Sequence, residues 1–237
     1  MSCSIGNCPF FDRHVDGETC LSDELQCIVD DVAQDVSFDR GEVLFLQGQP
    51  SSNLFSLKRG MVKICSHTPD GREQIVGFSI PGNLLVGVQS INDTRHAYAA
   101  IAVTPVSACR INQRTMLDRL RSRGDVAMRL IQAANAQLAH SRTLMEVLGH
   151  KCASAKIASF ILLMTPKSDT GQRDFSMPFS RVEIASILGL SEETVCRLMA
   201  NLKRSGAIYA PRGKIEIRDW DHLQAISEGN SALQVSG

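Results

Sequence analysis

The chain reads Ser180-Arg-Val-Glu-Ile-Ala-Ser-Ile-Leu-Gly-Leu-Ser-Glu-Glu-Thr-Val-Cys-Arg-Leu-Met-Ala-Asn-Leu-Lys-Arg-Ser-Gly206 near its C-terminus, and this stretch predicts two helices joined by a tight turn. Ser180 and Glu183 have the spacing of a capping box, which starts the first helix. Gly189 ends it, because glycine accepts the left-handed backbone at a helix C-terminus. Ser191 can cap the second helix. Apolar residues at helical spacing predict the buried faces of both helices: Ile184, Ala185, Leu188, Val195, Leu198, Met199 and Leu202.

The first turns of the second helix keep a polar outer face. A DNA-reading helix inserts its N-terminal part into the major groove, so this face predicts DNA contacts. The candidate contact residues are Ser191, Glu192, Glu193, Thr194, Cys196 and Arg197. An ordinary helical hairpin that packs on a core is the alternative interpretation.

Two short alternating runs follow this stretch, Ala207–Ala210 and Ile215–Arg218, around a glycine-containing turn. They predict a β-hairpin. A basic turn after a helix-turn-helix is typical of the wing of a winged helix, where Arg212 and Lys214 would lie near phosphates. The alternative is that both residues are solvated charges of a plain hairpin.

Charge is distributed unevenly along the chain, although its formal net charge is zero. Residues 1–40 hold nine acidic and two basic residues, whereas residues 151–218 hold eleven basic and six acidic ones. Local charge governs the approach to DNA, so the basic C-terminal part is consistent with DNA binding. The sequence shows no Gly-rich phosphate loop, no His-Glu metal pair and no nucleophile–His–Asp arrangement, so we do not expect an enzyme.

No stretch of 18 apolar residues and no signal peptide is visible, so we expect a cytoplasmic protein without a membrane partner. Its eight cysteines are then not a disulfide framework. They indicate metal, cluster or redox chemistry instead.

The middle of the chain changes from strands to helices. Short runs separated by turn residues over about 36–111 predict a small β-sandwich, barrel or roll. A helix over about 126–148 follows, then a buried helix over 153–164 and a polar loop over 165–174. The first of these helices carries a heptad seam, which predicts a dimer interface; packing on the chain's own β-domain is the alternative. The seam residues are Ala127, Ile131, Ala134, Leu138, Ser141, Met145 and Leu148.

Five motifs make the chain resemble the CRP/FNR family of transcription regulators, and its FNR/FixK branch in particular. They are Gly41-Glu-Val-Leu-Phe, Gly60-Met-Val-Lys, Asp70-Gly-Arg-Glu-Gln-Ile-Val-Gly-Phe, Pro81-Gly-Asn-Leu and Leu188-Gly-Leu-Ser-Glu-Glu-Thr-Val-Cys-Arg. The resemblance implies an α+β fold: an N-terminal β-roll of the cupin-like, cyclic-nucleotide-binding type, a long dimerisation helix and a C-terminal winged helix-turn-helix. The expected boundaries are a Cys-rich arm over 1–30, the β-roll over 31–122, the dimerisation helix over 123–150 and the DNA-binding domain over 151–230.

The same resemblance implies the function and the base contacts. The protein would bind an FNR-type palindrome in double-stranded DNA as a homodimer and act with RNA polymerase, mainly as an activator, in response to oxygen or redox state. Glu193 would accept from cytosine N4, and Arg197 would donate to guanine O6/N7 or to a phosphate. Cys196 stands where the branch has serine, and a thiol is the weaker donor. No cyclic AMP is expected, because the ligand-binding Gly-Glu and Arg-Ser pairs are Gly87-Val88 and His96-Ala97 here.

Oxygen-sensing members of the branch hold a [4Fe–4S] cluster with three N-terminal cysteines and a central one. The matching residues here are Cys3, Cys8, Cys20 and Cys109, and four thiolates are the usual complement. Other interpretations stay open: structural zinc, a thiol switch, haem, or a FixK-like regulator without a cluster that is controlled by cysteine oxidation or by its expression level. We expect Cys65 and Cys152 to be structural residues at core or helix-packing positions.

Overall fold

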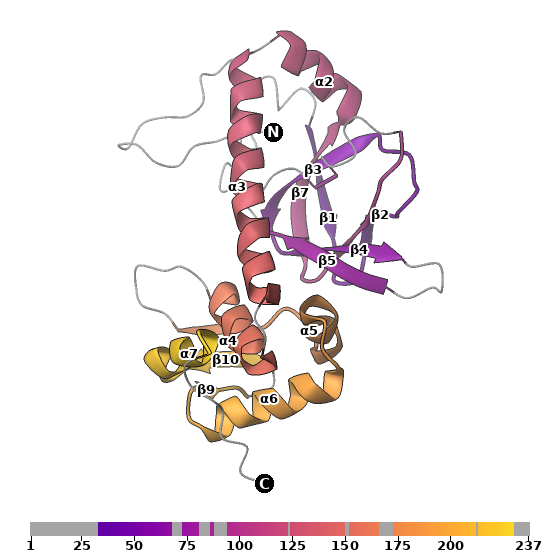
Figure 1. Cartoon of the computed structure of the whole chain (residues 1–237). Coiled ribbons are helices and arrows are strands. Elements are labelled where there is room, and N and C mark those ends of the chain that lie inside the picture. Colours follow the sequence, from indigo (N-terminus) through magenta and orange to yellow (C-terminus); the bar gives the residue numbers. More distant parts are fainter. Residues whose placement is uncertain are drawn as a thin grey trace. The chain divides into compact units, whose positions relative to one another are not determined.

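The computed structural model describes residues 33–67, 73–80, 86–87, 94–122, 124–149, 152–165, 173–211 and 213–229. The chain divides into two compact units between Ser141 and Arg142, that is, within its longest helix. Figure 1 shows a strand-rich unit coloured indigo to magenta and a mostly helical unit coloured orange to yellow. The expected Cys-rich arm, 1–30, lies outside the described residues.

In its described residues, the first unit contains two antiparallel sheets, one of three strands and one of four. One sheet has the order β1-β7-β3 and the other β2-β6-β4-β5. The strands are β1 (Ala33–Phe38), β2 (Val43–Phe45), β3 (Asn53–Arg59), β4 (Val62–His67), β5 (Glu73–Ser79), β6 (Ala99–Ala102) and β7 (Val106–Asn112). Strands that neighbour in space but not in sequence, such as β3 and β7, confirm the predicted β-roll.

The core of the roll contains side chains from both sheets. On β3 and β7, alternate residues such as Phe55, Leu57 and Ala108 enter it, because successive side chains of a strand point to opposite faces. Gly60 makes the turn that leads from β3 to β4, with φ of +87°. A Cβ there would lie 2.2 Å from the carbonyl oxygen of Pro105, so the turn requires glycine.

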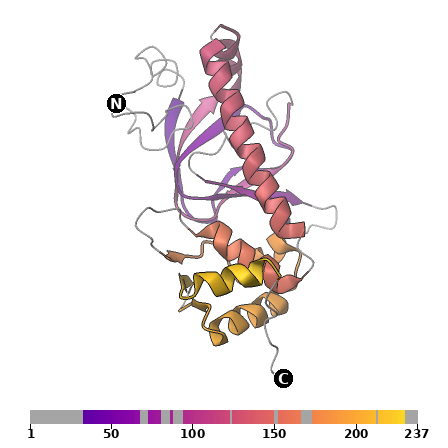
Figure 2. The same cartoon turned by 60° about the vertical axis from the view of Figure 1, so that its left-hand side comes forward.

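Two helices follow the roll. The helix α3 (Gly124–Gly149) confirms the predicted long helix and is continuous in Figure 2. The preceding helix α2 (Gln113–Ser122) was not predicted. Its start does have a local signal, since the Asn112 side chain accepts hydrogen bonds from the N–H and hydroxyl of Thr115.

In its described residues, the second unit contains the end of α3, four further helices and a small sheet in the order β8-β10-β9. Its elements are α4 (Ala153–Met164), β8 (Asp174–Ser176), α5 (Arg181–Leu188), α6 (Glu192–Arg204), β9 (Ile208–Tyr209), β10 (Lys214–Ile217) and α7 (Trp220–Ser227). The helix α4 has the predicted bounds. Sequence reasoning missed β8, which begins where a polar loop was expected to end, and α7, which packs against α4.

Candidate nucleic-acid interface

The α5–α6 pair forms the expected capped turn. Ser180 Oγ accepts from the Glu183 N–H at 3.3 Å, and Glu183 Oε2 accepts from the Ser180 N–H at 2.9 Å. These two bonds are the predicted capping box. Gly189 then adopts the left-handed conformation with φ of 63°, and Ser191 Oγ accepts from the Thr194 N–H at 3.2 Å to start α6. Local hydrogen bonds therefore set the direction in which α6 leaves the turn.

The helix α6 separates its apolar and polar residues as predicted. Val195, Met199 and Leu202 are buried, and Leu198 is half-buried. The exposed residues at the start of the helix and on its outer face are Ser191, Glu192, Glu193, Cys196 and Arg197. Thr194 differs from the other candidates, since it is half-buried and its hydroxyl is hydrogen-bonded to Ser191 Oγ at 2.8 Å.

A buried amide was missed on the same helix. Asn201 is 5% exposed, and its Oδ1 accepts from an Arg204 Nη. The 3.6-residue pattern that predicted the apolar face gives no signal for a buried polar residue. This bond holds the Arg204 guanidinium against the C-terminal turn of α6, where a positive charge is favoured by the helix dipole.

The predicted hairpin is present after α6. Ile208 pairs with Ile217 and Tyr209 with Glu216 across β9 and β10. Lys214 is exposed at the start of β10, next to Gly213, whose φ is +85°. Arg212 lies outside the described residues. Another cation was missed: the Arg218 guanidinium lies 4.5 Å from the centre of the Tyr209 ring, which places a positive charge on the hairpin face.

Cys109 lies in the middle strand of the sheet β1-β7-β3. Its neighbour Ala108 belongs to the core of the roll, so strand alternation places Cys109 on the opposite face of the sheet. Asp35 of β1 and Ser56 of β3 are its cross-strand partners. Its Sγ donates to Asp35 Oδ1 at 3.6 Å, and Lys58 Nζ donates to the same oxygen at 2.5 Å. The hydrogen bond from Lys58 lowers the pKa of the Asp35 carboxyl.

The other proposed ligands, Cys3, Cys8 and Cys20, lie outside the described residues. Within the described part of the chain, no three Cys, His, Asp or Glu side chains come together as a metal site would require. Cys65 is buried, as expected. The prediction for Cys152 is wrong: it is exposed at the N-cap of α4, where the Ser154 hydroxyl donates to its Sγ at 3.5 Å and lowers the pKa of its thiol.

The heptad seam of α3 is apolar and largely exposed in the single chain. Met145 is 60% exposed, Ile131 54%, Leu138 46% and Leu148 37%. Met128, which the seam prediction left out, is 56% exposed. Ala134 is exposed as well, and Ala127 and Ser141 are half-buried. Within the first unit, Ile131, Ala134 and Leu138 are therefore left exposed by the chain's own β-domain.

Two family models of known protein domains match this chain, one in each of its two units. The family model of the cyclic nucleotide-binding domain matches residues 35–123, and that of the Crp-like helix-turn-helix domain matches residues 155–226. The nitrogen fixation regulation protein FixK of Bradyrhizobium diazoefficiens is 32% identical over 199 residues, which cover 81% of each chain. This chain belongs to the CRP/FNR family.

This CRP/FNR regulator resembles members of the FNR/FixK branch in particular. The transcriptional activator protein Anr of Pseudomonas aeruginosa is 28% identical over 80% of this chain and 79% of its own length. The solved structure of FixK2 from Bradyrhizobium japonicum superposes with a TM-score of 0.72 at 26% identity, covering 85% of this chain and 98% of that one. These relatives are regulators and not enzymes. In the part of the CRP/FNR regulator that the structure describes, no helix is long and apolar enough to cross a membrane.

Proposed function

We propose that this CRP/FNR regulator is a transcription activator that binds an FNR-type palindrome as a homodimer and responds to oxygen or redox state. The observation that carries the proposal is the capped turn that leads into α6, with Glu193 and Arg197 exposed on the face that a recognition helix presents to DNA. Activation is supported by relatives whose names describe transcriptional activators. As an activator, the regulator would act with RNA polymerase.

Sequence readout would come from two charged residues of α6. The Glu193 carboxylate would accept from cytosine N4, and the Arg197 guanidinium would donate to a phosphate or to guanine O6 and N7, the commonest specific contact in the major groove. Lys214 of the wing would contact phosphate, a contact that positions the domain without reading bases. The half-site implied is similar to TTGAT.

Binding as a dimer follows from the exposed seam on α3. A two-fold pair of regulators presents two recognition helices to half-sites about one helical turn, or about 34 Å, apart. A second copy of the chain offers the matching apolar face, because an interface around a two-fold axis pairs the same surface of both copies.

The redox input would reach the regulator through a [4Fe–4S] cluster held by Cys3, Cys8, Cys20 and Cys109. Cys109 supports this proposal because its side chain lies on the face of the sheet opposite to Ala108 and beside Asp35 of the edge strand β1, although it is only 2% exposed in the single chain. The bound cluster would supply an oxygen-labile centre. The Lys58 ammonium, which lies beside the Asp35 carboxylate next to Cys109, would offset part of the negative charge gathered there.

A second candidate is a FixK-like regulator without a cluster that is controlled by cysteine oxidation or by its expression level. The observation in its favour is that Cys152 and Cys196 are free thiols exposed on the DNA-binding unit. Thiols that are exposed are the ones that oxidants reach.

Purification without air separates the two candidates. A cluster predicts a brown protein with about four irons per chain, and a Cys109→Ser variant that loses both the iron and oxygen-sensitive DNA binding. Cys152→Ser is the matched control, because it makes the same replacement at an exposed site and should keep the iron. Iron retained by Cys109→Ser at the wild-type ratio would reject Cys109 as a ligand.

DNA binding is tested separately by mobility shift on a TTGAT palindrome and on a scrambled duplex of the same length. Equal affinity for both would reject sequence readout by α6, whatever the outcome of the iron measurement.

A further inference from the structure

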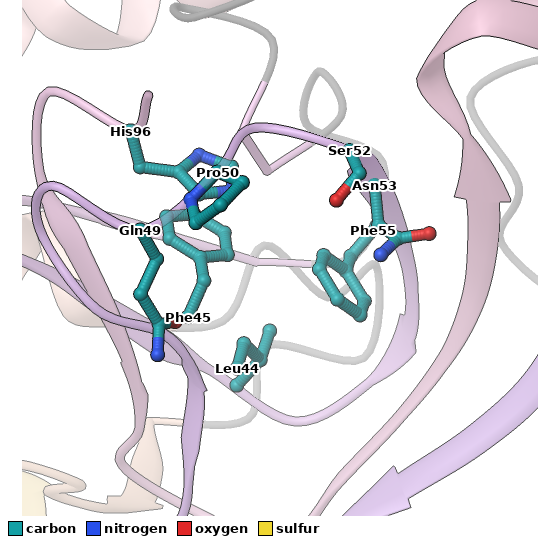
Figure 3. Close-up of a pocket in the computed structure, with 8 residues that line it drawn as sticks. All are labelled: Leu44, Phe45, Gln49, Pro50, Ser52, Asn53, Phe55 and His96. Atoms are coloured by element: carbon teal, nitrogen blue, oxygen red, sulfur yellow. The ribbon is translucent and has the colours of Figure 1, made fainter. Parts of the chain in front are cut away.

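A cavity of about 250 Å³ opens in the β-roll, and neither Cys109 nor any residue of α6 is among its described lining residues. Figure 3 shows Ser52 and Asn53 at one side of it and His96 at the other. The described lining residues come from β2, the turn after it, the start of β3 and the segment before β6: Leu44, Phe45, Gln49, Pro50, Ser52, Asn53, Phe55 and His96. Neither the DNA-binding proposal nor the cluster proposal uses any of them.

Stacked rings form one wall of the cavity. The His96 ring lies parallel to Phe45, with 3.7 Å between centroids and 15° between planes, and Phe45 in turn stacks on Phe55 at 6.0 Å. His96 is 4% exposed, and its Nδ1 has no hydrogen-bond partner in the described part of the chain. Stacking, together with the backbone bonds of His96 to Gly48 and Gln49, therefore holds this ring in place. Flat rings of this kind favour a flat, aromatic partner.

None of the described lining residues carries a formal charge. Burial lowers the pKa of His96, so its imidazole is neutral at pH 7. The adjacent cation, Arg95, donates from Nη1 to the Gly48 carbonyl at 2.6 Å. A phosphate or carboxylate bound here would lose hydration without gaining a cation from the described lining residues, which is costly.

Polar groups at the rim can hold the edge of a ligand. The Gln49 Oε1 already accepts from the Leu46 N–H at 2.8 Å, which directs its NH₂ group to serve as a donor. Asn53 is half-buried and Ser52 exposed, and Figure 3 shows both at the cavity. A few polar groups over an apolar floor are the usual composition of a small-molecule site, and this volume lies below that of drug-sized sites.

We propose that this cavity binds a small, uncharged, planar ring compound that carries hydrogen-bonding groups on its edge. The ring would stack beside His96 and Phe45, and its edge would bond to the side chains of Ser52, Asn53 and Gln49. The proposal is independent of the cluster and of DNA binding.

The test compares two probes of the same shape that differ in charge, 4-hydroxybenzamide and 4-hydroxybenzoate, each titrated against the full chain by saturation-transfer NMR. We expect the neutral amide to bind about tenfold or more tightly than the carboxylate, because the site has no cation for the charge. Cyclic AMP should not displace the amide. No saturation transfer to the amide at millimolar concentration, equal affinity for both probes, or displacement by cyclic AMP would each overturn the proposal.

Variants of the lining residues test whether the probe binds in this cavity. Asn53→Leu keeps the volume of the side chain but removes its hydrogen-bonding groups, and should weaken amide binding about fivefold. Ser52→Ala is a second variant at an exposed position, where folding is not at risk, and should weaken binding as well. Gln34→Ala removes an amide of β1 that is not among the described lining residues of the cavity, and should leave binding unchanged. Wild-type affinity in both Asn53→Leu and Ser52→Ala would show that the probe binds elsewhere.

Discussion

Replacing Ile131 with glutamate tests whether the apolar face of α3 holds two copies of this regulator together. Ile131 is 54% exposed in the single chain, so about half of its side chain remains to be covered by a partner. Full burial of such a side chain is worth about 1.5–3 kcal/mol, so each copy would lose about 1 kcal/mol of burial. Each copy would also place an unpaired carboxylate in the seam, at about 1–3 kcal/mol.

Two copies meet at a two-fold seam, so both penalties count twice. The dimer should therefore be weakened by about 4 kcal/mol or more, which raises its dissociation constant about a thousandfold. Sedimentation equilibrium or light scattering at micromolar concentration would then show monomers, and affinity for the palindrome should fall because only one half-site is held at a time.

Thr143→Glu is the matched control. Thr143 is exposed on the same helix, but it lies two positions beyond the seam residue Ser141 and five beyond Leu138, on the other side of the helix. The same charge there should leave the dimer intact. An Ile131→Glu protein that stays dimeric at wild-type affinity would show that this face is not the interface, and a Thr143→Glu protein that also dissociates would show that charge alone disrupts the dimer.

Three further changes test other parts of the regulator. Arg197→Ala should cost about 1–3 kcal/mol on the specific palindrome and less on random DNA, measured by fluorescence anisotropy; equal losses on both would make Arg197 a phosphate contact. Peroxide should weaken DNA binding, because oxidation of Cys196 adds negative charge beside the phosphates. The Cys196→Ser variant should keep its affinity for DNA after the same treatment. An equal loss of affinity in both proteins would show that Cys196 is not the oxidised group. Burial lowers the pKa of His96, so the β-roll should lose stability as the pH falls below about 6.5, until the folded imidazole is itself protonated at its lower pKa. Denaturant unfolding at pH 7.5 and 5.5 should show a smaller loss of stability in His96→Phe than in the wild type. An equal loss in both proteins would assign the pH dependence to other groups.

Local signals in the sequence predicted the DNA-reading part of this protein closely. The Ser180–Glu183 capping box, the left-handed Gly189 and the Ser191 cap depend on residues three or four positions apart, so the sequence contains all of the partners that each feature needs. The apolar stripes of α4 and α6 depend only on the helical period. Both helices consequently appear at the expected positions.

Short elements escaped the same reasoning. The strand β8 has three residues, and it pairs with β10, whose Lys214 is opposite Ser176 and lies far along the chain. A three-residue run has too few positions to show an alternation. The helices α2 and α7 each start at a single capping residue, Asn112 and Asp219, which sequence reasoning passed over.

The sequence by itself determined which elements form wherever the stabilising partners are neighbours along the chain, including the turn and the helix that would read DNA. Only the tertiary structure decided what surrounds each functional side chain. Cys109 came to lie beside Asp35, and His96 beside Phe45, because strands distant in sequence pair in one register. Cys152, expected at a core or helix-packing position, is exposed at the N-cap of α4. The burial of a side chain depends on contacts with residues that are far away in the sequence. The residues next to it along the chain do not specify those contacts.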